Sequence, residues 1–178
     1  MFAIVLAALD RSGSVLPILC AMAVHELAHV VMMLACGGQV RRLTLRFADL
    51  QIAASGLGYR QELLSALAGP LVNLICGAAF CMQRPSFAAY SLMLGIYNLL
   101  PVWPLDGGRM LRCALLARLP ITQAEHISEI VSFAACAVLL LIGVFLTFFR
   151  KSGLWPLGTA AYLTVRLLML ARRTDAVQ

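Results

Sequence analysis

The sequence has few charged residues. Only 12% of its 178 residues are Asp, Glu, Lys or Arg, whereas 62% are hydrophobic, and the mean hydropathy is +0.90. Soluble domains usually contain about 25% charged and about 45–50% apolar residues. A soluble fold of this size has no interior large enough for so much apolar surface, so the sequence predicts an integral membrane protein.

The sequence also lacks the patterns of two other classes. Its net charge of +6 is spread between apolar runs rather than gathered in a basic stripe, which argues against a nucleic-acid partner. None of the six cysteines belongs to a CxxC pair, so we interpret them as small buried hydrophobic residues rather than disulfides or zinc ligands. No internal repeat, low-complexity tract or second domain is visible.

Five apolar stretches are long enough to cross a bilayer as helices, which takes roughly 20 residues each. They are residues 14–36, 62–82, 86–105, 127–149 and 153–171. A sixth stretch, residues 2–9, would reach only about 12 Å, so it is either a partial or tilted helix or a late start of the chain. The predicted fold class is therefore an all-α polytopic membrane protein with five to six transmembrane helices, in a single domain over residues 1–178.

The basic residues in the loops predict the orientation. If residues 2–9 cross the membrane, nine of them lie on one side: Arg41, Arg42, Arg46, Arg60, Arg109, Arg112, Arg118, Arg172 and Arg173. Four lie on the other side: Arg11, Arg84, Arg150 and Lys151. Because cytoplasmic loops carry an excess of Lys and Arg, the C-terminus is predicted to be cytoplasmic, in a multi-pass protein of the cell membrane.

The loop formed by residues 37–58 is not a plain linker. Residues 43–47 alternate in polarity, Ala48 and Asp49 can form a turn, and residues 50–52 alternate again. This pattern predicts a short β-hairpin at the membrane edge. The alternative is a surface hairpin without a function.

The strongest chemical signal is His25-Glu26-Leu27-Ala28-His29 inside an apolar helix. The spacing of four places both imidazoles on one helix face, one turn apart, where they can share a tetrahedral zinc ion. Glu26 is then positioned to act as the catalytic base. With three His and four Glu in the chain, chance gives only roughly 0.001 such motifs. Charged groups inside a membrane are also costly and usually functional.

Asp106 is the best candidate for a third zinc ligand. It lies in the segment NLLPVWPLDGGR, where two prolines interrupt the helix before it and two glycines allow the backbone to turn just after it. To bring Asp106 to the depth of His29, either the prolines bend the segment inward or its helix lies deeper in the membrane than the predicted span. The alternative for this segment on its own is a helix-ending Asp-Gly turn at the interface.

The series VHELAH, SALAGPLVN and NLLPVWPLDGGR resembles the site-2 protease family of intramembrane metalloproteases, peptidase M50, and most nearly its stage IV sporulation protein FB branch. The resemblance implies a six-helix core and one zinc ion per chain, with His25, His29 and Asp106 as ligands and Glu26 as base. It also implies cleavage of a membrane-embedded or membrane-adjacent protein, as in regulated proteolysis during bacterial sporulation. The hairpin would help to hold an extended substrate.

Three further residues are assigned to substrate binding through the same resemblance: Asn98, Asn73 and Pro101. For the two asparagines the alternative is an interhelical hydrogen bond, which is the commonest role of Asn in a membrane helix. We expect no PDZ or CBS domain, so regulation would come from a membrane partner or be absent.

Three other functions are compatible with parts of the pattern. A different class of membrane zinc protease would draw a ligand from a Glu or His on another helix. A metal transporter or sensor would use the His and Asp residues to carry ions, and an inactive binding protein would lack catalytic residues, all of which are present here. The substrate, the regulator and the oligomeric state are not specified by the sequence.

Overall fold

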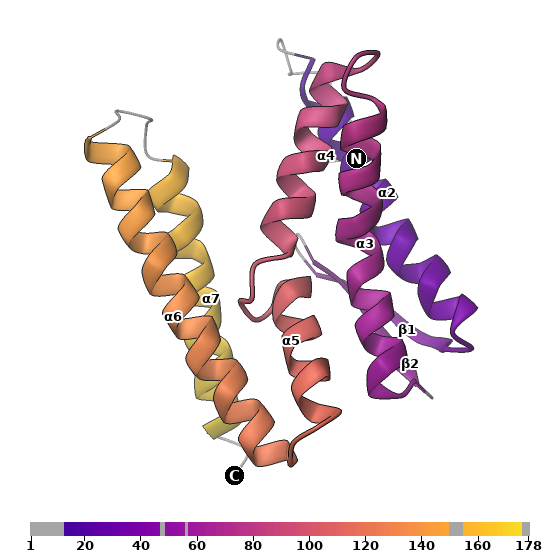
Figure 1. The fold of residues 1–178 in the computed structure, drawn as a ribbon, viewed down its shortest axis with the longest axis vertical. Coiled ribbons are helices and arrows are strands. Elements are labelled where there is room, and N and C mark those ends of the chain that lie inside the picture. The colour runs from indigo at the N-terminus through magenta and orange to yellow at the C-terminus, as the bar shows by residue number, and fades with distance from the viewer. Residues whose placement is uncertain (1–12, 47–48, 56, 150–154, 176–178) are drawn as a thin grey trace. The chain divides into compact units, whose positions relative to one another are not determined.

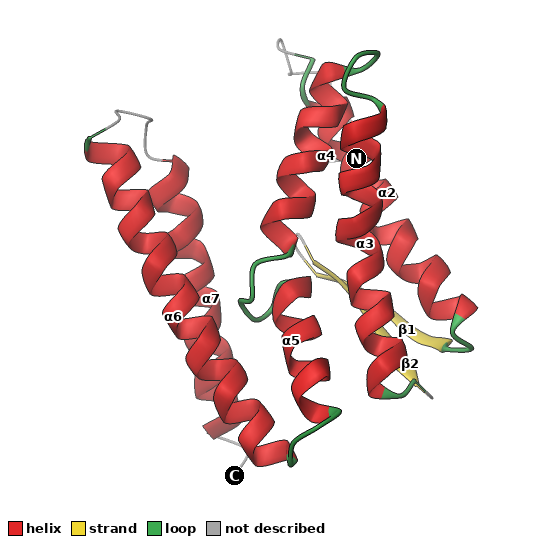
Figure 2. Cartoon of the chain, in the orientation of Figure 1, coloured by secondary structure: helices red, strands yellow, loops and turns green. Residues whose placement is uncertain are grey.

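The computed structural model describes residues 13–46, 49–55, 57–149 and 155–175, so the predicted first segment, residues 2–9, lies outside the described residues. Six helices and two strands occur in this part of the chain (Figure 2). In chain order they are α2 (Val15–Ala35), β1 (Gln39–Arg46), β2 (Asp49–Ser55), α3 (Tyr59–Ala79), α4 (Pro85–Asn98), α5 (Asp106–Leu116), α6 (Ile121–Phe148) and α7 (Trp155–Asp175). All six cysteines lie within it, and none forms a disulfide.

The chain divides into two compact units, residues 1–99 and residues 100–178. In the first unit α2, α3 and α4 pack against one another, and the β-hairpin follows α2 (Figure 1). In the second unit α5 packs on α6, and α6 packs on α7. The assignment of both units to one functional domain stays a prediction.

Three of the described helices are long and apolar enough to cross a membrane: α2, α3 and α6, with 21, 21 and 28 residues. At 1.5 Å per residue, 21 residues extend about 31 Å, which matches the hydrocarbon thickness of a bilayer. Large apolar side chains such as Leu16, Leu141 and Phe148 are exposed on their outer faces. These helices are therefore consistent with an integral membrane protein. The predicted span 153–171 corresponds to α7, which is not among the three.

The span predicted over residues 86–105 corresponds to a helix that ends before the two prolines. Helix α4 ends at Asn98 after 14 residues, about 21 Å, and an irregular segment leads to α5. Pro101 and Pro104 lie in this segment and lack the N–H groups that a continued helix needs. The helix α5 that follows was not predicted, because its sequence has the glycines and arginines of a loop.

The two strands form an antiparallel sheet in which Leu43 pairs with Ile52 and Leu45 pairs with Leu50. The strands include most of the residues for which alternation predicts a hairpin, and they extend further on both sides. The predicted turn is only partly described, since Ala48 lies outside the described residues, whereas Asp49 begins β2.

Helix α3 begins at a well-defined cap. The backbone N–H of Gly58 donates to Oε1 of Gln61 at 2.9 Å, and Nε2 of the same side chain donates to the carbonyl of Cys36 at 3.1 Å. One glutamine thus closes the first turn of α3 and ties it to the residue that follows α2. This contact fixes the start of α3 relative to the end of α2.

Candidate metal centre

Helix α2 places both histidines of the HExxH motif on its buried face. His25 is 4% exposed and His29 is 7% exposed, whereas Glu26, on a neighbouring part of the same turn, is half-buried. The Nε2 atoms of the two rings lie 3.1 Å apart. Two nitrogen ligands of a tetrahedral zinc, each about 2.0–2.1 Å from the metal, would lie about 3.4 Å from one another. The spacing predicted from the sequence therefore gives a pair of nitrogens that can share one cation.

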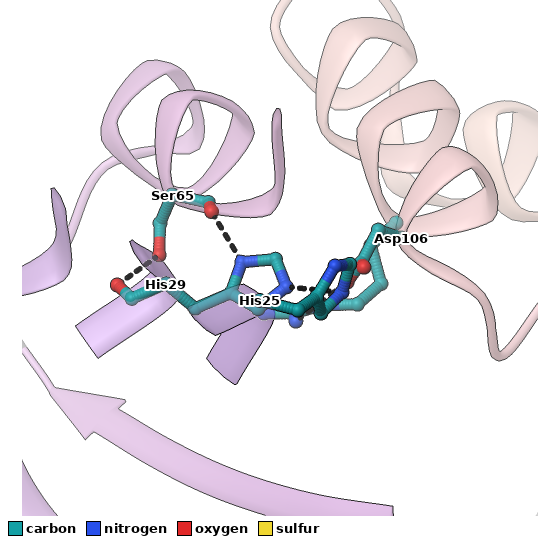
Figure 3. A network of polar contacts seen from close by, with 5 residues as sticks. His25, His29, Ser65 and Asp106 are labelled. Carbon is teal, nitrogen blue, oxygen red and sulfur yellow. Dashed lines mark hydrogen bonds and ion pairs between the residues drawn. The ribbon is translucent and has the colours of Figure 1, made fainter. Parts of the chain in front are cut away.

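Helix α3 orients the two rings from the opposite side. Nδ1 of His29 lies 2.7 Å from the carbonyl oxygen of Ser65, and the Ser65 hydroxyl donates to the carbonyl of His29 at 3.3 Å. Figure 3 shows His29 bonded to Ser65 on one side and in contact with His25 on the other. Because a carbonyl only accepts hydrogen bonds, His29 must carry its proton on Nδ1, which leaves the Nε2 lone pair available.

Asn73 also lies against the histidines. Its side chain is completely buried, and its Nδ2 lies 3.1 Å from Nδ1 of His25. The amide thus makes an interhelical contact between α3 and α2, as the simpler interpretation of a membrane-helix asparagine predicts. Its assignment to substrate binding stays a prediction.

The second unit holds the predicted third ligand. Asp106 is the first residue of α5 and is 8% exposed, and its carboxylate forms an ion pair with Arg109 at 3.6 Å, one turn further along the helix. A carboxylate at this end of a helix is favoured by the helix dipole. The two glycines after Asp106 lie inside the first turn of α5, so the predicted chain turn at this point is wrong.

The irregular segment before Asp106 is held by its own unit. The Trp103 backbone N–H donates to the hydroxyl of Ser132 on α6 at 3.1 Å. A Cβ on Gly108 would meet the backbone of Val102 and Trp103 at 2.6 Å, so only glycine allows the segment to fold back onto α5. These contacts determine where Asp106 begins its helix.

The two remaining predicted residues have local partners. Nδ2 of Asn98 donates to the carbonyl of Leu94 in its own helix at 3.1 Å, and the side chain is half-buried. The Pro101 carbonyl accepts a long hydrogen bond, 3.5 Å, from the Ser132 hydroxyl. Both assignments to substrate binding stay predictions.

Sequence reasoning missed Ser65, Gly69 and Ser132. A Cβ on Gly69 would collide with the His29 ring and would lie 2.9 Å from Cε1 of His25, so glycine is what lets α3 approach the histidines. The signal was present, because Ser65 and Gly69 are small residues four apart in an apolar helix, which is a pattern of close helix packing. Ser132 has no comparable signal.

The donor set fits zinc. His25, His29 and Asp106 are all buried, and each offers one ligand atom, which gives two imidazole nitrogens and one carboxylate oxygen. Zinc in catalytic sites takes three such protein ligands and leaves a fourth position open. The carbonyl that holds Nδ1 of His29 is the usual outer partner of a metal-bound imidazole.

Comparison with known proteins agrees with this chemistry. The model of peptidase family M50 matches residues 84–142. The chain is 28% identical over 138 residues to stage IV sporulation protein FB of Bacillus subtilis. This match covers 70% of this chain and 47% of that protein. It is 26% identical over 133 residues to the zinc metalloprotease MJ0392 of Methanocaldococcus jannaschii, covering 67% of this chain and 39% of that protein.

A third relative and a solved structure extend the comparison. The putative zinc metalloprotease Rip3 of Mycobacterium tuberculosis is 32% identical over 125 residues, which is 60% of this chain and 32% of that protein. The chain therefore spans less than half the length of each of these curated relatives. The structure of the site-2 protease from Methanocaldococcus jannaschii matches 94% of this chain and 83% of that one, with a TM-score of 0.68 and 20% identity, which shows the fold.

Proposed function

We propose that the chain is an intramembrane zinc metalloendopeptidase of peptidase family M50, of the site-2 protease type, to which it is similar in sequence. The observation that carries the proposal is the pair of buried imidazoles on α2, with Nε2 atoms 3.1 Å apart and a glutamate next to one of them in sequence. Buried titratable side chains in a membrane helix need a function to offset their cost.

In this proposal His25, His29 and Asp106 hold one zinc ion per chain, and both units form a single protease domain. Its support is the donor set, two imidazoles and a carboxylate, which leaves the fourth position open for catalysis. Each of the three side chains is buried, where water competes little for a metal ion.

The ion would polarise the scissile carbonyl and lower the pKa of the attacking water. The Glu26 carboxylate accepts a proton from that water as its oxygen attacks the carbonyl carbon, and then donates the proton to the leaving amide nitrogen as the C–N bond breaks. Asn98, Asn73 and Pro101 remain candidates for contacts with the substrate. Because a helix uses its own carbonyls in hydrogen bonds, the substrate must unwind at the cleaved bond.

The experiment that tests this function replaces Glu26 by Gln, which keeps the shape and removes the base. The purified protein and the Glu26→Gln variant should each hold about one zinc per chain. Cleavage by the variant should fall by at least about 10²-fold. Comparing membrane proteomes of cells with either form would identify the substrate. Metal transport that persists in the variant, with no cleavage by either form, would support a transporter instead.

We further propose a multi-pass protein of a bacterial cell membrane with a cytoplasmic C-terminus, acting on a membrane-embedded or membrane-adjacent protein, with a membrane partner as one possible regulator. The nine-to-four distribution of loop cations supports this orientation. A reporter that works only in the cytoplasm should be active when fused after Gln178. Activity of a reporter that requires export would reverse the orientation. The name of the Bacillus subtilis relative refers to sporulation, so sporulation is the first process in which to test this protein.

The hairpin of β1 and β2 is proposed to lie at the membrane and to hold the substrate as an added strand. A two-stranded sheet has outer edges with unpaired backbone groups, and an extended peptide can pair with such an edge. Leu45→Pro removes a backbone N–H and should reduce cleavage of a membrane substrate more than cleavage of a short soluble peptide. Leu45→Ala keeps the N–H and serves as the control. Equal losses for both substrates would exclude strand addition.

A further inference from the structure

Three residues of α3 line the face that meets the histidines: Ser65, Gly69 and Asn73. They are spaced four apart, which is also the spacing of His25 and His29 on α2. All three are buried. Residues four apart share one helix face, so α3 presents one continuous strip to the two rings.

The middle of this strip has no side chain, and the rings lie directly on the helix backbone. A Cβ on Gly69 would lie 2.6 Å from Cε1 of His29 and would collide with its Nε2. The orientation of the rings therefore depends on which groups α3 offers at either end of the strip. At one end, the Ser65 carbonyl already fixes the proton of His29 on Nδ1.

The other end of the strip is Asn73, and only one of the two polar atoms of its amide has a partner. Nδ2 of Asn73 lies 3.1 Å from Nδ1 of His25, while Oδ1 is one of two buried side-chain atoms in the described residues that have no hydrogen-bond partner. A half-turn of the amide about its Cβ–Cγ bond exchanges the two ends in nearly the same volume. In that orientation Oδ1 accepts a hydrogen bond from Nδ1–H of His25, and Nδ2 takes the place where the oxygen has no partner.

This orientation matters for the metal. With protons on both Nδ1 atoms, the two Nε2 atoms present lone pairs to one another at 3.1 Å, an arrangement that a cation bound to both stabilises. Metal-bound histidines usually donate their other ring N–H to an oxygen in this way, and loss of that oxygen typically lowers metal affinity about 10–100-fold.

We propose, resting on the proposed function, that Asn73 is a positioning residue of the zinc site. Its amide oxygen holds the proton of His25 on Nδ1 and so directs the Nε2 lone pair to the metal. The Ser65 carbonyl does the same for His29, and the missing side chain of Gly69 gives both rings their place against α3.

The experiment measures zinc affinity of the purified full chain by competition with a chromophoric chelator. Asn73→Leu has the same branched shape and no acceptor, so the affinity should fall about 10–100-fold. Asn73→Asp offers an oxygen to the same N–H and should restore affinity to within a few-fold of the parent. Ser91→Ala is the matched control, because the Ser91 hydroxyl is the second buried atom without a partner, and its removal should leave zinc affinity unchanged.

A second measurement separates positioning from folding. Asn73→Leu leaves Nδ1 of His25 without its amide partner, so with chelator present the variant should unfold at a lower temperature than the parent but in one cooperative transition, and zinc affinity is compared on the folded proteins. Unchanged zinc affinity in Asn73→Leu would overturn the proposal, as would a loss that Asn73→Asp does not restore. Either result leaves the protease function intact, provided that the parent binds zinc and needs Glu26. A parent that binds no zinc would exclude both.

Discussion

The two units of the chain position their proposed zinc ligands by different means. In the first unit the histidines lie on one helix, while a second helix, through Ser65 and Asn73, sets the orientation of their rings. In the second unit Asp106 stands at the start of its own helix and pairs with Arg109 one turn away. One arrangement depends on contacts between residues about 40 positions apart, and the other on local backbone. Substitutions should therefore affect zinc through ring orientation in the first unit and through the shape of one segment in the second.

The largest effects should come from the ligands themselves. If both units build one site, His29→Ala and Asp106→Ala should each leave only two protein ligands. Zinc content should then fall from about one per chain to near zero, and cleavage should be lost. Metal analysis after dialysis measures the first effect, and peptide cleavage the second. If Asp106→Ala kept full zinc and full activity, the site would belong to the α2–α3 pair alone.

Two glycines provide the next test, since each allows a close contact in its own unit. Gly69→Ala should push the imidazoles away from α3 and lower zinc content, because the added methyl group occupies the place of the His29 ring. Gly108→Ala should destabilise the fold by about 1–3 kcal/mol, because the methyl group meets backbone that cannot move aside.

The control for both is Gly158→Ala in α7, where a new Cβ has no atom within 4 Å. That change should be neutral or should stabilise the helix by up to about 1 kcal/mol. Zinc content and the denaturation midpoint should be measured on all three variants. If Gly69→Ala bound zinc like the parent, direct contact of the rings with α3 would not be required.

The difference between local structure and contacts of distant residues also explains which features the sequence could predict. The histidine pair follows from a spacing of four in a helix, which is local information, and the three longest apolar helices follow from composition. The interruption of the helix near Pro101 and Pro104 also follows from the sequence, but the new helix that begins at Asp106 does not. Gly107 and Gly108 usually indicate a turn, but here they lie in a helix because another backbone segment packs against Gly108.

The other features that the sequence does not predict are contacts between residues far apart in the chain. Nothing in the sequence near Ser132 indicates that its hydroxyl accepts a hydrogen bond from Trp103, 29 positions away. The sequence marks Asn73 as a candidate for substrate binding or for an interhelical hydrogen bond. Its contact with His25 depends on how α3 packs on α2, which the sequence does not show. Spacing predicts which residues share a helix face, whereas it does not predict which face of a neighbouring helix they meet.

The hydrogen bond from Trp103 to Ser132 should have a moderate effect. Ser132→Ala leaves the backbone N–H of a partly buried residue without its acceptor, which should destabilise the second unit by about 1–3 kcal/mol. Cleavage should fall as well, because the same segment leads to Asp106. Thr159→Ala is the control, since its exposed hydroxyl donates only locally, to the Pro156 carbonyl, and its loss should be nearly neutral. Equal denaturation midpoints for the two variants would contradict the bracing role of Ser132.

The smallest effect should come from the exposed ion pair between α5 and α6. Arg112 donates to Glu125 at 2.8 Å, and its guanidinium also lies over the Trp103 ring at 5.9 Å from the centroid. Both charged side chains are about a third exposed or more, so the pair should contribute only about 0.2–1 kcal/mol and should weaken in high salt.

Arg112→Ala should cost more than Glu125→Ala, because it also removes the contact with the Trp103 ring, worth about 0.5–1 kcal/mol at an exposed position. A double-mutant cycle, measured by denaturation at low and high salt, separates the ion pair from the ring contact. Zinc affinity should be the same in all these variants, since the histidine rings are oriented by buried groups of the other unit. A salt-dependent zinc affinity that disappears with Arg112→Ala would mean that the support of the metal site extends to this surface pair.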